Sequence, residues 1–304
     1  MNYKIRKILF LLTRNCRTNL KVIGKELKIS QQAVSYQINK LEKEKNITYF
    51  TLTDHIKLGF INIFVGMNFK SYTKENQRKI LSQLRAQETI VSVFKGESGI
   101  DILFEIQARN LSHFNKTFSQ FIEINSKIID TKFIQPMIVK HTYPRNYLIK
   151  KNEYEDIVTL GDRDYQAISD DDEKVLRQFE KKPRITLMEL SKQTKLGVKK
   201  VLSIKKNLEK KAIIRKYSCH FNHKKMGISK KILLLKSKEE FITNIDTLVE
   251  FAKIHPNIIE LTKLIGKYNI MIITESLQSE NILEEIREKF PINEHIVITV
   301  EKQL

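Results

Sequence analysis

The chain contains one pattern of residues twice, and this repeat limits the folds open to its 304 residues. Arg17 corresponds to Arg184, and Leu41-Glu42 corresponds to Leu208-Glu209, at a common offset of 167 residues. Further along, Gly96 corresponds to Gly266 at an offset of 170. Solenoid repeats have periods of only about 20–50 residues. The sequence therefore predicts a duplicated pair of domains, each with its own core.

Positive charge is concentrated in two segments of the repeat. The whole chain has a formal net charge of +19. Residues 1–60 hold 12 Lys/Arg against 4 Asp/Glu, and residues 171–230 hold 18 against 6, while the other segments nearly cancel. Charge of one sign placed in two copies of one element indicates a polyanionic partner. The alternative is that these lysines cover ordinary solvated helix faces.

Each basic segment has the pattern of three short helices followed by a β-rich stretch. In the first copy we predict helices over 3–13, 19–27 and 31–43. Asn19 is expected to cap the second of these helices and Ser30 the third. Asn46 is expected to end the third helix in the left-handed conformation. The second copy repeats this order, with Thr186 as the cap of its second helix and 197–210 as its third helix. Three helices and a ribbon predict a winged helix-turn-helix, whose third helix can enter a major groove.

A βαββαβ pattern follows each winged helix and predicts an α/β plait of the ferredoxin-like type. The fold class is therefore α+β. The predicted organisation is a winged helix over 1–60, a plait over 61–143, a polar and acidic linker over 144–170, a second winged helix over 171–229 and a second plait over 230–304. In the second plait, helices are expected over 238–254 and 279–290.

The order of these motifs resembles the Lrp/AsnC (feast/famine) transcriptional regulators. Residues 29–42 resemble that family's helix-turn-helix signature, and residues 171–176 resemble its usual opening. Gly266-Lys267-Tyr268-Asn269 resembles the family's Gly-x-Tyr-Asp effector motif, and the turn from Gly96 to Asp101 is a longer version. There are departures: the family's glycine after the third helix aligns with Asn46 and Ala212, and the motif aspartate becomes Asn269 in the second copy.

The resemblance implies a sequence-specific DNA-binding regulator of transcription, responsive to an amino acid, whose plait (RAM-type) domains pair. Family members usually carry one copy per chain and dimerise. Here the two plaits could pair within the chain or as a homodimer. Apolar alternation suggests the faces that would pair: Ile63, Val65 and Met67 in one plait, and Ile232 and Leu234 in the other.

The candidate DNA-binding residues lie on the predicted third helices. Those of the first copy are mostly amides, hydroxyls and one cation: Gln31, Gln32, Ser35, Tyr36, Asn39 and Lys40. Those of the second copy are mostly lysines: Lys199, Lys200, Ser203 and Lys206. Amides can pair bidentately with adenine, whereas lysines bind phosphate without regard to sequence. The first copy is therefore expected to specify and the second to hold the backbone. Arg17 and Arg184, which precede the second helices, are expected to contact phosphate.

The resemblance also implies an effector site at the first plait turn. Gly96, Ser98 and Gly99 would offer backbone amides to an amino acid's carboxylate, and Asp101 would meet its ammonium group. The alternative is that this turn and its counterpart are only tight loops joining strands.

Other function classes find little support. Cys219-His220-Phe221-Asn222-His223 lacks the spacing of a zinc finger, and no phosphate-binding glycine loop occurs. We expect no catalysis, metal or cofactor. Two cysteines without a pairing pattern and the lack of an apolar run of about 20 residues favour the cytoplasm. Two alternatives stay open: an enzyme like the sirohaem decarboxylases, which share the two-domain plan, and a weakly specific chromatin-like packaging protein.

Overall fold

The computed structural model describes residues 1–149, 151–238, 245–278 and 280–303. They form two compact units. The first unit contains 1–58, 144–153 and 163–227, and the second contains 59–143, 154–162 and 228–304. Within these described ranges, every helix is too short or too polar to cross a bilayer. The mixed class of winged helices and ferredoxin-like plaits is confirmed.

The first winged helix has the predicted elements. Helices α1 (Tyr3–Arg14), α2 (Leu20–Leu27) and α3 (Gln31–Lys43) precede strand β1 (Ile47–Thr53) and the short helix η1 (His55–Leu58). Asn19 Oδ1 accepts the Lys21 N–H at 2.8 Å, and Ser30 Oγ accepts the Ala33 N–H at 3.1 Å. Both predicted caps are thus confirmed, and they satisfy donors that a helix start leaves free. The core consists of buried aliphatic residues, among them Ile8, Leu12, Ile23, Val34 and Ile38.

The second winged helix repeats this order. It contains α6 (Asp170–Lys181), α7 (Leu187–Thr194), α8 (Val198–Lys210), β7 (Ile214–Phe221) and α9 (His223–Met226). Helix α7 begins with a capping box: Thr186 Oγ1 accepts the Glu189 N–H, and the Glu189 carboxylate accepts the Thr186 N–H. Such reciprocal bonds fix where a helix starts.

Both third helices end in the same left-handed turn, but one residue earlier than predicted in the first copy. Lys45 (φ 53°) and Ala212 (φ 53°) are the left-handed residues. The Lys45 N–H donates to Glu42 O at 3.0 Å and the Asn46 N–H donates to Leu41 O at 2.9 Å, which is the Schellman arrangement. The expectation for Asn46 was therefore wrong, and the counterpart of Ala212 is Lys45. Asn46 occupies the next, buried position.

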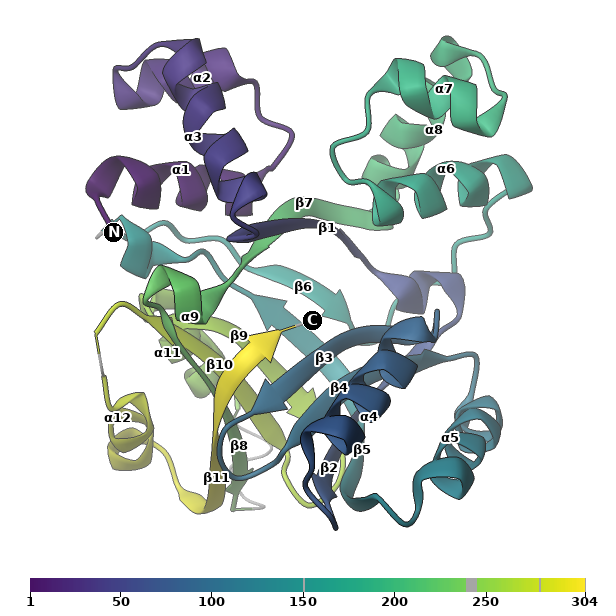
Figure 1. The fold of residues 1–304 in the computed structure, drawn as a ribbon, viewed down its shortest axis with the longest axis vertical. Coiled ribbons are helices and arrows are strands. Elements are labelled where there is room, and N and C mark those ends of the chain that lie inside the picture. Colours follow the sequence, from purple (N-terminus) through teal and green to yellow (C-terminus); the bar gives the residue numbers. More distant parts are fainter. Residues whose placement is uncertain (150, 239–244, 279, 304) are drawn as a thin grey trace. The chain divides into compact units, whose positions relative to one another are not determined.

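Strands β1 and β7 pair with each other in an antiparallel two-stranded ribbon. Phe50 lies opposite Ser218, with Tyr49 opposite Cys219 on one side and Thr51 opposite Tyr217 on the other. Residues of β1 and β7 correspond at an offset of 168, so Tyr49 is the counterpart of Tyr217 and Thr51 is the counterpart of Cys219. A local two-fold axis through the Phe50–Ser218 pair therefore exchanges the two flanking pairs. In Figure 1 the two three-helix groups lie on the same side of this ribbon, one toward each end. The first unit thus contains an isologous interface formed inside one chain.

The second unit contains both βαββαβ repeats. The first repeat consists of β2 (Ile61–Phe69), α4 (Lys74–Ala86), β3 (Ile90–Gly96), β4 (Ile102–Ala108), α5 (Leu111–Asn125) and β5 (Ile129–Thr142). The second consists of β8 (Ser229–Ser237), α11 (Asp246–Ile254), β9 (Ile258–Leu264), β10 (Ile270–Ser276), α12 (Ile282–Lys289) and β11 (Ile292–Gln303). Parts of the helices expected over 238–254 and 279–290, namely 239–244 and 279, lie outside the described residues.

The strands of the two repeats join into one sheet in the order β2-β4-β3-β11-β8-β10-β9-β5-β6, and β2 also pairs with β5 (Figure 1). The repeats meet twice: Val300 of β11 lies opposite Gly96 of β3, and Met137 of β5 lies opposite Leu264 of β9. These pairings use backbone groups that open sheet edges would leave exposed. The two plaits of this structure are therefore joined through their edges.

The apolar faces that were expected to pair lie differently in the two plaits. Ile63, Val65 and Met67 lie in the core with Ile80 of α4 and Phe114 of α5, so that part of the expectation was wrong. Their face of β2 is covered by the plait's own helices. In β8 the named residues do not face the plait's helices. Leu233 and Leu235 join the helix-covered core, whereas Ile232 and Leu234 are buried outside that cluster.

The segment 144–170 contains regular structure where a linker was expected. Helix η2 (Asn146–Leu148) contacts α1 within the first unit, and β6 (Ile157–Leu160) pairs with β5 within the second. The reason is that apolar side chains interrupt its polar composition: Tyr147, Leu148, Ile157 and Leu160 are all buried.

Candidate nucleic-acid interface

The exposed face of α3 contains the residues that the sequence selected. Val34, Ile38 and Leu41 point into the core. This leaves the other faces for solvent: Gln31, Gln32, Tyr36, Asn39 and Lys40 are exposed, and Ser35 is half-buried. Tyr36 is 66% exposed. The structure therefore brings all six candidates of this helix onto its open surface.

The exposed face of α8 is built in the same way but with other side chains. Val201, Ile204 and Leu208 are buried, whereas Lys199, Lys200, Ser203 and Lys206 are exposed. Lys200 Nζ lies 2.5 Å from Asp171 Oδ2. This hydrogen bond from the Lys200 ammonium lowers the pKa of the Asp171 carboxyl, which lies at the first turn of α6. A phosphate that binds Lys200 must compete with this exposed ion pair, which is a weak contact.

The two arginines expected at phosphate have partners within the protein. Arg17 Nη1 donates to Pro183 O at 2.6 Å and to Ile185 O at 2.9 Å. Its guanidinium carbon also lies 5.2 Å from the centroids of the Phe179 and Tyr217 rings. Arg17 belongs to the first winged helix and these four partners belong to the second. The guanidinium therefore connects the two copies, and a phosphate contact by Arg17 stays a prediction.

Arg184 makes the reciprocal connection. Its Nη1 donates to Glu42 Oε1 at 2.7 Å and to the Tyr49 hydroxyl oxygen at 2.9 Å, while the Tyr49 hydroxyl donates to Glu42 Oε1 at 2.6 Å. Burial and the Glu42 contact together raise the pKa of Tyr49 above its usual range. A hollow of about 580 Å³ is lined by Glu42, Ile47, Thr48, Tyr49 and Arg184.

Sequence reasoning missed Glu42, Tyr49 and Tyr217 as interface residues. The signal was present in the repeat, because Glu42 corresponds to Glu209 and Tyr49 corresponds to Tyr217. When the same polar residue occurs at the same helix position in both copies, it predicts one contact that forms on both sides of a two-fold interface.

The predicted effector residues lie together in the turn between β3 and β4. The Gly96 N–H donates to Asp101 O at 2.9 Å, and Asp101 Oδ2 accepts the Phe69 N–H at 2.8 Å. In the second plait, Asn269 Oδ1 accepts the Ser237 N–H at 3.0 Å in the equivalent way. Aspartate and asparagine thus serve one structural purpose in the two turns.

The first turn also packs closely on β11. Gly99 has φ +77°, and a Cβ there would lie 3.0 Å from Ile296 Cγ2 and from Val297 O. The Glu97 N–H donates to Thr299 O at 2.8 Å. The turn is therefore already filled by backbone and aliphatic groups of the second repeat.

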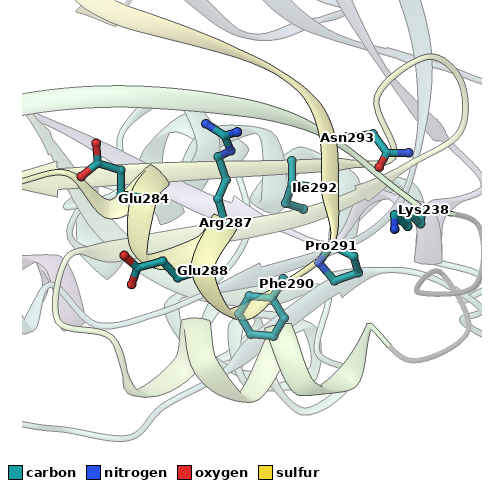
Figure 2. Close-up of a pocket in the computed structure, with 8 residues that line it drawn as sticks. All are labelled: Lys238, Glu284, Arg287, Glu288, Phe290, Pro291, Ile292 and Asn293. Carbon is teal, nitrogen blue, oxygen red and sulfur yellow. The ribbon is translucent and has the colours of Figure 1, made fainter.

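A second hollow, of about 460 Å³, lies at the end of α12 (Figure 2). It is lined by Lys238, Glu284, Arg287, Glu288, Phe290, Pro291, Ile292 and Asn293. No sequence pattern predicted this hollow, and none of the predicted site residues lines it.

Comparison with known proteins identifies the family. A family model described as winged helix-turn-helix DNA-binding matches residues 1–45. The HTH-type transcriptional regulator LysM of Sulfurisphaera tokodaii is 35% identical over 112 residues, which cover 36% of this chain and 77% of that protein. The chain belongs to the Lrp/AsnC family of transcriptional regulators. LysM of Saccharolobus solfataricus is 25% identical over 122 residues, which cover 40% of this chain and 84% of that protein.

Among solved structures, the siroheme decarboxylase NirDL is similar over nearly the whole chain. The TM-score is 0.60, with coverage of 99% of this chain and 91% of that protein, at 13% sequence identity. A likeness at this identity concerns the arrangement of elements, since one fold supports many chemistries. The family member described here thus shares its full-length architecture with an enzyme and its closer sequence likeness with regulators.

Proposed function

We propose that this chain is a sequence-specific DNA-binding regulator of transcription in which one polypeptide supplies both recognition helices, α3 and α8. The observation that carries the proposal is the β1–β7 ribbon. It joins the two winged helices in one unit, and Arg17 and Arg184 connect them in both directions. Family regulators with one winged helix per chain need a second chain for the same arrangement.

The proposed DNA contacts are the exposed side chains of the two helices. On α3, Gln31, Gln32 and Asn39 present amides that can contact base edges in a major groove. On α8, Lys199 and Lys206 present ammonium groups for phosphates. The concentration of basic residues in these two segments supports a polyanionic ligand, because the net charge of the other segments is close to zero.

Pairing of the plaits inside one chain is part of the proposal. The β3–β11 and β5–β9 pairings support it, since they use the strand edges through which separate chains could otherwise join. The expected stoichiometry is one chain per operator. Light scattering at low micromolar concentration, with and without an operator duplex, should give a monomer and a one-to-one complex. A strict dimer in both measurements would contradict this part.

The test of the function itself is selection of bound duplexes from a random pool. We expect enrichment of one sequence, and an affinity for it that exceeds the affinity for random DNA by a factor of about 10³ or more. A Gln32→Ala variant should lose part of that preference. Tyr72, which is 60% exposed on the second unit, gives a matched control in Tyr72→Ala. Equal binding of all duplexes would instead identify a packaging protein.

An amino-acid effector at Gly96, Ser98, Gly99 and Asp101 stays a prediction. The bond from the Phe69 N–H to Asp101 Oδ2 and the close packing of Gly99 favour a purely structural turn. Thermal-shift measurements with each amino acid test the point, because a ligand at ~100 times its dissociation constant stabilises its site by ~2.7 kcal/mol. A shift that disappears in Asp101→Asn would support an effector at this turn.

In this proposal the chain is not an enzyme. The likeness to a siroheme decarboxylase concerns the fold alone, at 13% identity. A decarboxylase has no need for two basic segments with exposed recognition helices. Incubation with a sirohaem substrate, followed by absorbance and by carbon dioxide release, checks this directly. Turnover by the purified chain would overturn the proposal.

A further inference from the structure

We infer that the operator of this chain is asymmetric, with one specified half-site under α3 and one half-site under α8 that is bound almost regardless of sequence. The inference rests on the proposed DNA-binding function. The operator should therefore not be palindromic. A symmetric dimer, in contrast, binds a palindrome because both of its recognition helices are the same.

The framework that presents the two helices is symmetric. The β1–β7 register exchanges Tyr49–Cys219 with Thr51–Tyr217 across the local axis. Side-chain contacts obey the same exchange: Lys57 Nζ donates to Lys211 O at 2.8 Å, and its counterpart Lys225 Nζ donates to Glu44 O at 2.9 Å. A third exchanged pair is formed by the Arg17 guanidinium over the Tyr217 ring and the Arg184 guanidinium over the Tyr49 ring. Helices α3 and α8 are therefore held in equivalent positions, and each can meet one half-site.

The surfaces carried by this framework are not equivalent. At the offset of 167, exposed Gln32 corresponds to exposed Lys199, and exposed Asn39 corresponds to exposed Lys206. Four more exposed pairs differ in chemistry: Gln31 and Val198, Ala33 and Lys200, Tyr36 and Ser203, and Lys40 and Asn207. Lys43 and Lys210, at the ends of the two helices, are the same. In contrast, the inward pairs keep their apolar character, as Val34 and Val201 or Leu41 and Leu208 show. The divergence is thus confined to the side that faces solvent.

The difference decides what each half-site contributes. An amide can donate to and accept from one adenine edge, and this distinguishes adenine from other bases by a factor of roughly 5–150, or ~1–3 kcal/mol. A lysine ammonium is a compact point charge without the paired donor and acceptor of an amide, and it binds phosphate, which every sequence offers equally. The α3 half-site should therefore contain conserved adenines, and the α8 half-site should add affinity and salt dependence but little preference.

Selection from a random pool, followed by footprinting, tests the inference. We expect one conserved half-site and, about 10 base pairs away, a protected region without conserved bases. A Lys210→Cys variant carrying a tethered iron chelate should cut in the unconserved region, since Lys210 is exposed on α8 and the native Cys16 and Cys219 are buried. A conserved palindrome, or cleavage at the conserved half-site, would overturn the inference.

Exchange of the two surfaces provides the matched pair of variants. The first variant gives α8 the surface of α3: Val198→Gln, Lys199→Gln, Lys200→Ala, Ser203→Tyr and Lys206→Asn. It should select a palindrome. The reverse variant gives α3 the surface of α8: Gln31→Val, Gln32→Lys, Ala33→Lys, Tyr36→Ser and Asn39→Lys. It should bind random duplexes at least as tightly as the unaltered chain and lose the preferred sequence.

All substituted side chains are exposed, so both variants should keep the thermal midpoint of the unaltered chain. Persistence of the original asymmetric site in the first variant would show that these side chains do not determine the preference, and would overturn the inference. Absence of DNA binding by the unaltered chain is a different outcome, because it would remove the proposed function itself.

Discussion

Replacement of Arg17 by alanine should destabilise the first unit by about 2–3 kcal/mol. The guanidinium donates to Pro183 O and Ile185 O at 2.6 and 2.9 Å. Hydrogen bonds from charged donors contribute roughly 1.5–3 kcal/mol each when well shielded. The Phe179 and Tyr217 rings, each 5.2 Å away, add ~0.5–1 kcal/mol each. These contributions together would be about 4–8 kcal/mol. Because Arg17 is half-buried, water recovers part of them, and we place the net loss below that range, at about 2–3 kcal/mol.

Urea unfolding followed by circular dichroism measures this loss. Arg78→Ala, at an exposed arginine of α4, is the control and should stay within about 0.5 kcal/mol of the unaltered chain. Arg17→Lys keeps the charge but lacks the planar group that spans two carbonyl oxygens, so its midpoint should lie between those of the unaltered chain and Arg17→Ala.

DNA titrations separate this structural role from the phosphate contact that the sequence suggested. A residue that neutralises one phosphate contributes about −0.9 to the slope of log affinity against log salt concentration. We expect the slope to be unchanged in Arg17→Ala. A slope that is weaker by about 0.9, with no change in the urea midpoint, would refute the structural explanation and restore the phosphate contact.

Three further outcomes follow from the structure. Ala212→Gly should stabilise the chain by about 0.5–1 kcal/mol in the urea assay. It removes left-handed strain of roughly 1–2 kcal/mol, and the added entropy of glycine in the unfolded chain costs about half of that. Ala33→Gly, in exposed α3, should instead destabilise the chain by about 1 kcal/mol in the same assay. Burial raises the pKa of the Cys16 thiol to about 11, so little of the reactive thiolate is present at pH 8. A disulfide reagent at pH 8 should therefore label Cys16 only after unfolding, and rapid labelling of the native chain would contradict this. Burial raises the pKa of Glu260, so the native state holds this proton more tightly than the unfolded state. Stability should therefore decline as pH rises from the ordinary pKa of a glutamate through the raised pKa, and Glu260→Gln should show a smaller decline. An equal decline would remove Glu260 as its source.

Local features of the winged helices could be predicted because they depend on neighbours in sequence. Asn19, Ser30 and Thr186 cap helices through residues two or three positions ahead, and apolar spacing fixes the buried sides of α3 and α8. The same reasoning misplaced Asn46 by one residue. The left-handed position went to Lys45, because the turn geometry and not the residue type decides where a Schellman turn forms.

Contacts between the repeats could not be predicted from these patterns. The β3–β11 pairing joins residues about 200 positions apart, and no local signal indicates which edges will meet. Arg17 and Arg184 looked like phosphate ligands because solvated and buried arginines have the same sequence signature. Only the structure shows that backbone carbonyls, aromatic rings and Glu42 occupy their guanidinium groups.

The ribbon of β1 and β7 changes how such a regulator responds to its own abundance. When two separate chains must meet before they bind, operator occupancy at low copy number rises with the square of the protein concentration. If one chain binds one operator, as proposed, both recognition helices arrive on one polypeptide, joined by strand pairing from Ile47–Phe221 to Thr53–Ile214. Occupancy would then rise in direct proportion to concentration. A cell that contains only a few molecules would thus keep a graded response to gene dosage, and mixed dimers with related regulators would have no route to form through this ribbon.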